Sequence, residues 1–156
     1  MTFDKRLRQH RIIRSRRIMR CCLKEINDKY GHEVGDKTLQ KIAAILKQSF
    51  RADDYMCRIG GDEFMVLMVH IQADVRRLIE HKVAQINADL ADTQDGLPPI
   101  SVSVGVSLCG KTDNPQDMFH EADVALYYVK DHGRNGCCFF EPGMREVTRF
   151  VKSCKG

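Results

Sequence analysis

The apolar residues of this chain follow two spacings, one typical of helices and one typical of strands. A spacing of three and four residues predicts helices over 36–50 and 73–90, and a third that begins at Pro115 and ends near Gly133. Shorter apolar runs predict strands over 55–59, 63–69, 100–108 and 136–140. In 100–108 the apolar residues alternate with serine and glycine, so we expect a half-buried strand there.

The predicted elements follow one another as helix, strand hairpin, helix, strand, helix and strand. This order favours an α+β fold in which helices pack on a mainly antiparallel sheet. With 156 residues and 43% hydrophobic positions, the chain fits one globular domain with its own core. No apolar run is long enough to span a membrane, and the first residues lack the pattern of a secretory signal. Seven cysteines without a C-x-x-C pair are typical of reduced thiols, and we expect a cytoplasmic protein.

The charge is unevenly distributed. The net charge is +4, but residues 1–20 hold eight basic side chains and one acid, a charge of +7, which leaves −3 on the remaining 136 residues. A basic arm can bind nucleic acid or an acidic membrane surface, or it can be a solvated helix or tail. No aromatic residue follows Phe3 in this segment and no nucleic-acid motif follows it, so we expect no nucleic-acid partner.

The sharpest local feature is Gly60-Gly61-Asp62-Glu63-Phe64, between two predicted strands. Two glycines permit positive φ angles in a hairpin turn and let a ligand approach the backbone. Two successive carboxylates can hold a hard cation such as Mg²⁺. The alternative is a charged, solvated hairpin turn without a ligand.

Three further segments accompany this turn in a fixed order. They read LKEINDKYGHEVGD over 23–36, SVGV over 103–106 and ADVALYYVKDHGRN over 122–135. Together with the turn they resemble the GGDEF domain family, the diguanylate cyclases, from residue 23 to about 140. The resemblance implies a palm-like α+β domain similar to nucleotidyl cyclases. It also implies condensation of two GTP molecules into cyclic di-GMP and pyrophosphate, with Mg²⁺ (or Mn²⁺) as cofactor. Each domain then presents one GTP, so the implied partner is a second copy, within a longer signalling protein.

The resemblance assigns roles residue by residue. Asn27 and Asp36 match positions that bind the guanine edge, and their structural alternatives are a turn cap and a helix cap. Gly60 and Gly61 match positions beside the nucleotide. Asp62 and Glu63 match the acidic pair that binds metal and acts in catalysis. The positions that contact the phosphates are Lys24, Lys130 and Arg134.

The phosphate contacts of Lys130 and Arg134, and a further site that the resemblance implies, each have an alternative interpretation. Lys130 and Arg134 can instead interact with the dipole of the helix that they end. Arg51-Ala52-Asp53-Asp54 matches the family's R-x-x-D inhibitory site, in which Arg51 and Asp54 bind the product. The alternative is an arginine at a helix end and an aspartate in a turn.

The first 22 residues depart from the family pattern. Met19 and Cys21 replace two expected aspartates, the first of which is a metal ligand, and neither sulfur group suits Mg²⁺. The expected central strand should be apolar, yet here it is rich in arginine. Three explanations compete. The chain is a degenerate module that binds GTP or cyclic di-GMP as a regulatory receptor, or it is a domain whose N-terminal strand is displaced. In the third explanation, the first 22 residues derive from a shifted reading frame. We therefore expect three parts: an atypical segment 1–22, a GGDEF domain 23–142 and a tail 143–156.

Overall fold

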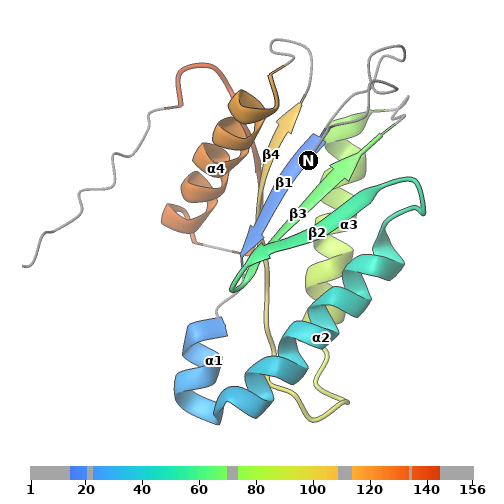
Figure 1. The fold of residues 1–156 in the computed structure, drawn as a ribbon, viewed down its shortest axis with the longest axis vertical. Helices are drawn as coiled ribbons and strands as arrows, with labels where there is room; N and C mark the ends of the chain where they lie inside the picture. Colours follow the sequence, from blue (N-terminus) through green and yellow to red (C-terminus); the bar gives the residue numbers. More distant parts are fainter. Residues whose placement is uncertain (1–14, 21–22, 70–73, 109–113, 134, 145–156) are drawn as a thin grey trace, which may run out of the picture.

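The computed structural model describes residues 15–20, 23–69, 74–108, 114–133 and 135–144, and for 15–20 and Pro115 only the backbone. The helices are α1 (Leu23–Tyr30), α2 (His32–Ser49), α3 (Val75–Ala91) and α4 (Pro115–Asp131). The strands are β1 (Ser15–Arg20), β2 (Tyr55–Gly60), β3 (Glu63–Met68), β4 (Ser103–Leu108) and β5 (Gly136–Phe139). They form one sheet in the order β2-β3-β1-β4-β5, antiparallel except between β4 and β5 (Figure 1). The predicted α+β class with a mainly antiparallel sheet is confirmed.

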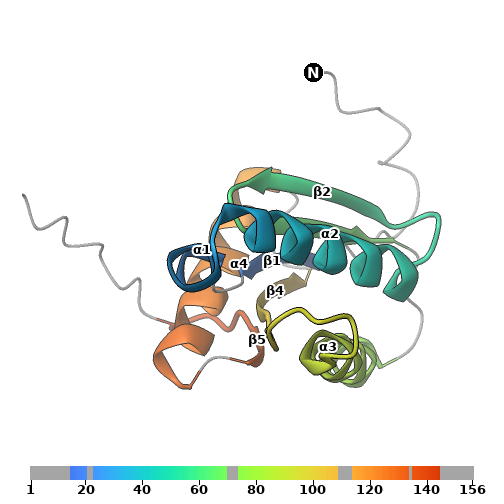
Figure 2. The ribbon, with the colours of Figure 1, turned by 90° about the horizontal axis from the view of Figure 1, so that it is seen from below.

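The helices cover the sheet from two sides. Figure 2 shows α4 on one side, and α2 and α3 on the other. The main core lies on the α2–α3 side, where Ile42, Ile79 and Val66 are fully buried. Among the described residues, no helix is both long and apolar enough to cross a membrane.

The prediction that 100–108 is half-buried is wrong. Every residue of β4 from Ser103 to Ser107 is buried, because α4 packs on the serine and glycine side. The Ser107 hydroxyl donates a hydrogen bond to the Glu121 carboxylate of α4 over 2.5 Å. Small polar residues in this strand therefore mark a close helix contact, and not a surface exposed to solvent.

The central strand contradicts the expectation of an apolar segment in this place. β1 lies between β3 and β4 although four of its six residues are polar or basic. The register pairs Met19 with Phe64 and Val104, and it pairs Arg20 with Glu63. The main-chain hydrogen bonds of a ladder do not depend on side-chain type, so pairing on both sides can hold a basic segment in the sheet.

Two helical boundaries differ from the prediction. The segment 23–30 forms α1, which the apolar spacing did not indicate because only Leu23 and Ile26 are apolar in its first two turns. The next helix begins at His32 and not at Asp36, since Gly31 with φ 87° breaks the chain direction directly before it. Asp36 consequently lies inside α2, and the alternative that it caps this helix is wrong.

Candidate functional site

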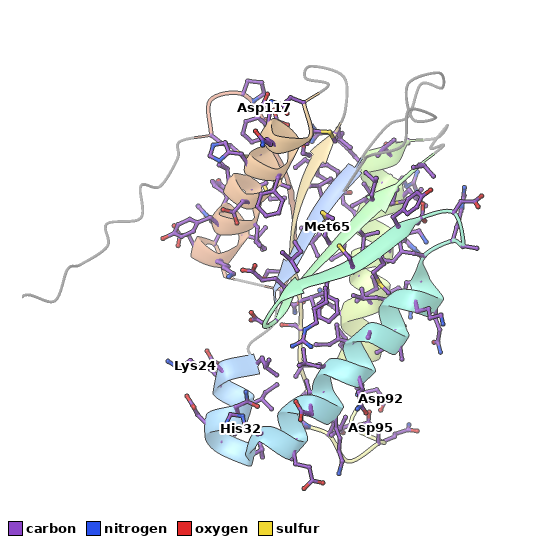
Figure 3. The ribbon with its side chains drawn as sticks, in the orientation of Figure 1. Lys24, His32, Met65, Asp92, Asp95 and Asp117 are labelled. Carbon is purple, nitrogen blue, oxygen red and sulfur yellow. The ribbon has the colours of Figure 1, made fainter. Side chains whose placement is uncertain are left out.

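One end of the sheet gathers most of the candidate residues. The register joins Glu63 to Arg20, Arg20 to Ser103 and Ser103 to Gly136 in one row across the strands. The turn between β2 and β3, the end of β1 that leads to α1, and the connection from α4 to β5 therefore meet at this end. Figures 1 and 3 show the same arrangement, with Lys24 on α1 below the hairpin turn.

The hairpin turn is open on its glycine side. Gly61 has φ +43°, and a Cβ at Gly60 or Gly61 would have no atom of the described residues within 4 Å. The Arg58 side chain donates a hydrogen bond to the Gly61 carbonyl over 2.8 Å and so connects β2 to the turn. Asp62 and Glu63 are half-buried beside the exposed Gly60 and Gly61, which is compatible with a ligand-binding turn and with the charged, solvated turn of the alternative interpretation. Its backbone is accessible and carries two acids at its end.

The junction of α1 and α2 holds the two residues expected to bind guanine. Asn27 lies in α1, and its main-chain carbonyl accepts from the Gly31 N–H over 2.9 Å. Its amide oxygen is buried and has no hydrogen-bond partner in the part of the chain that the structure describes. That oxygen packs on Gly35, where a built Cβ would overlap it. Asp36 follows Gly35 and is exposed. The sequence did not reveal that Gly35 leaves room for the Asn27 side chain. Its place directly before Asp36 in the motif was the one indication that it has a role.

Two of the three expected phosphate contacts fall on described residues. Lys24 is exposed on the first turn of α1, and Lys130 lies in the last turn of α4. A cation at that place also interacts favourably with the helix dipole, so both interpretations of Lys130 stay compatible. Arg134 lies outside the described residues, as does Cys21.

The R-x-x-D pair lies at the other end of β2. Asp54 accepts from the main-chain N–H of Arg51 over 3.0 Å and from that of Val69 over 3.3 Å. The turn aspartate of the alternative interpretation is thus present, and Arg51 is exposed beside it. Six residue steps of extended chain separate Asp54 from Gly60, roughly 20 Å. A ligand at this pair would occupy a site separate from the hairpin turn.

The carboxylates near the turn supply some, but not all, of the ligands that a hard cation needs. Over the described ranges, no group of three or more histidine, cysteine, aspartate or glutamate side chains could hold a metal ion. Asp62 and Glu63 supply two carboxylates, and Mg²⁺ is often bound by one or two carboxylates together with substrate phosphates. The pair therefore fits a cation that a triphosphate helps to bind.

The family profile described as diguanylate cyclase, GGDEF domain, matches residues 18–136. The chain belongs to the GGDEF domain family. The match starts at Ile18 inside β1, after Arg16 and Arg17, and it covers all of the motif-bearing segments, but the first residues of the basic strand fall outside it. The recognition made from the motifs is confirmed.

Relatives and solved structures agree with this membership. The bifunctional diguanylate cyclase/cyclic di-GMP phosphodiesterase MucR of Pseudomonas aeruginosa is 38% identical over 78% of this chain and 18% of its own length. The diguanylate cyclase TpbB of the same species is 34% identical over 71% of this chain and 26% of its own length. This chain therefore spans about a quarter or less of either relative. The crystal structure of the TpbB GGDEF domain superposes with a TM-score of 0.78 at 28% identity, covering 88% of both chains.

Proposed function

We propose that this chain is a diguanylate cyclase domain that condenses two GTP molecules into cyclic di-GMP and two pyrophosphates. The observation that carries the proposal is the open Gly60–Gly61 turn with Asp62 and Glu63 at its end, beside α1 and the end of α4. A second copy of the domain completes the reaction, because one site presents only one GTP. We further propose a palm-like, nucleotidyl-cyclase-like arrangement, and work in the cytoplasm as one module of a longer signalling protein.

The guanine is bound at the junction of α1 and α2. Guanine carries N–H donors on its Watson–Crick edge, and the Asn27 amide oxygen accepts no hydrogen bond from the described residues. An unpaired buried acceptor costs about 1–3 kcal/mol, and rotation of the Asn27 side chain from Gly35 toward a bound guanine would relieve that cost. The Asp36 carboxylate accepts from the same edge. Two acceptors at neighbouring positions favour guanine over adenine, whose edge presents a different pattern.

The phosphates lie between the turn and the two cationic helix ends. Lys24, Lys130 and Arg134 balance the charge of the triphosphate, and glycine at 60 and 61 leaves room for its approach. Asp62 and Glu63 would hold Mg²⁺ or Mn²⁺ through carboxylate oxygens. When bound, the ion neutralises phosphate charge and lowers the pKa of the attacking hydroxyl.

The reaction is a phosphoryl transfer repeated twice. The 3′-hydroxyl oxygen of one GTP forms a bond to the α-phosphorus of the other, and the bond from that phosphorus to the bridging oxygen breaks. Pyrophosphate leaves, and the acidic pair assists loss of the hydroxyl proton. Catalysis depends mostly on the positions of the two substrates and on compensation of their charge. The residues at this end of the sheet therefore bind and orient GTP, and none forms a covalent bond to it. We also propose that the product, cyclic di-GMP, binds at Arg51 and Asp54 and inhibits the condensation reaction.

One feature favours a second candidate function. Met19 stands where the family pattern has a metal-binding aspartate, and its thioether is a poor ligand for Mg²⁺. A domain short of one carboxylate can retain GTP or cyclic di-GMP binding and act as a regulatory receptor without turnover.

Incubation of the purified chain with GTP and Mg²⁺ separates the two candidates, with chromatographic detection of cyclic di-GMP. Product that is lost in Glu63→Ala supports the cyclase. Binding of GTP or cyclic di-GMP without any product supports the receptor instead. Absence of both binding and product refutes the nucleotide site itself.

A further inference from the structure

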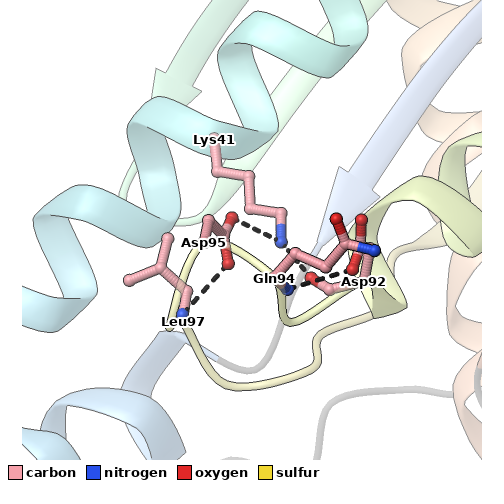
Figure 4. Close-up of polar contacts among 5 residues, drawn as sticks. All are labelled: Lys41, Asp92, Gln94, Asp95 and Leu97. Atoms are coloured by element: carbon pink, nitrogen blue, oxygen red, sulfur yellow. Dashed lines mark hydrogen bonds and ion pairs between the residues drawn. The ribbon is translucent and has the colours of Figure 1, made fainter.

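Lys41 of α2 is a charged side chain enclosed by the protein. Its side chain is 12% exposed, and its ammonium group donates to the main-chain carbonyl of Asp92 over 2.5 Å and to the Asp95 carboxylate over 2.8 Å (Figure 4). Enclosing a charge is costly unless it is paired and hydrogen-bonded, and both conditions are met here. This contact joins residues 51 positions apart in the chain.

The partner loop has hydrogen bonds of its own. Asp95 also accepts from the Leu97 N–H over 3.0 Å, and Asp92 accepts from the Gln94 N–H over 3.0 Å. Gly96, with φ +76°, donates to the Thr93 carbonyl over 2.9 Å. The loop that follows α3 is therefore a fixed support to which the ammonium group is attached.

The attached part of α2 carries the proposed guanine site. Lys41 lies five residues after Asp36, and α1 with Asn27 packs mainly against α2. At 100° per residue, Asp36 and Lys41 are roughly 140° apart around the helix axis. Ile42 and Leu39 fix one side of α2 in the core, and Lys41 fixes a second side. Two attachments on different sides prevent rotation of the helix about its axis.

From this geometry we propose that Lys41 is a positioning residue for guanine recognition. It fixes the rotation of α2 about its axis and thereby the direction in which Asp36 faces. The inference rests on the proposed function. Loss of the attachment leaves the hairpin turn and Lys130 in place and loosens the guanine contacts that α1 and α2 carry. Its effect should therefore fall on recognition of the base and not on the reaction at the hairpin turn.

The test compares Lys41→Met with Lys41→Arg and with Lys37→Met. Lys37 lies one turn earlier on α2, next to Asp36, and its ion pair with Glu33 is exposed at both ends, so its loss is a matched control. Affinities are measured for GTP and for inosine triphosphate, which lacks the 2-amino group of guanine, together with KM and kcat. Circular dichroism establishes that each variant is folded at the assay temperature.

We expect Lys41→Met to lower GTP affinity about 10-fold, with a smaller loss for inosine triphosphate, so that preference for GTP falls. KM should rise with little change in kcat, Lys41→Arg should restore most of the preference, and Lys37→Met should match the wild type. An unchanged preference in folded Lys41→Met overturns the inference while GTP binding by the wild type keeps the proposed function. Failure of the wild type to bind GTP overturns both.

Discussion

The contact between α4 and β4 makes a sharp prediction for Gly105→Ala. A Cβ at Gly105 would overlap the main-chain carbonyl of Ala122 and lie 2.7 Å from the Leu126 Cβ. Carbon atoms in contact are normally 3.5–4.0 Å apart, so α4 must move from the sheet by about 1 Å. The obstacle is mostly helix backbone, which no side-chain rotation can relieve. Overpacking of this kind costs about 1–3 kcal/mol, and we expect a value near the upper end.

The measurement is urea unfolding followed by circular dichroism, in which a lower midpoint at constant slope reports lost stability. Gly136→Ala is the matched control, because a Cβ at Gly136, in the neighbouring strand, would meet none of the described residues within 4 Å. That variant should stay within about 0.5 kcal/mol of the wild type. Because α4 carries Lys130, Gly105→Ala should also weaken GTP binding. Equal stability of Gly105→Ala and the wild type would refute the close packing of α4 on β4.

Three further predictions concern separate parts of the molecule. Met19→Asp should raise cyclic di-GMP production by about 10-fold or more, because it restores a hard oxygen ligand, and an unchanged rate would show that position 19 does not limit turnover. The hydrogen bond from Lys41 holds the pKa of Asp95 below its ordinary range. The stability that wild type gains over Asp95→Asn should be complete above about pH 4 and shrink as the pH falls further, and a difference that grows in acid would contradict this. Burial, with the nearby Glu141 charge, raises the pKa of the Cys138 thiol, whereas Cys57 is exposed. N-ethylmaleimide should therefore modify Cys57 before Cys138 at pH 7.5, as peptide mass spectrometry can determine.

The sequence predicted elements whose apolar spacing is regular and missed those whose pattern is not. The hairpin strands, α3, and α4 with Pro115 in its first turn follow from spacing and capping alone. β1 did not, because its arginines conflict with a central place in a sheet that main-chain pairing nevertheless gives it. Burial of β4 depends on how the next helix, α4, packs on its serine and glycine side, which alternation within the strand cannot indicate.

The same limit applies to the candidate site. Motif spacing pointed to the residues around the turn and to Asn27. Only the structure reveals that the Asn27 amide oxygen is buried and has no partner among the described residues. Lys37 and Lys41 look alike in the sequence, as two lysines one turn apart on a helix. One forms an exposed pair within its own helix, and the other attaches α2 to a loop more than 50 residues away. Long-range partners of this kind do not follow from helical periodicity.

The most direct test of the proposed activity is the conversion of GTP by the purified chain in the presence of Mg²⁺, compared with Glu63→Ala under the same conditions. The account predicts cyclic di-GMP and pyrophosphate in a ratio of one to two for the wild type, and neither for the variant. Wild-type protein that binds GTP yet releases no cyclic di-GMP would contradict the cyclase assignment.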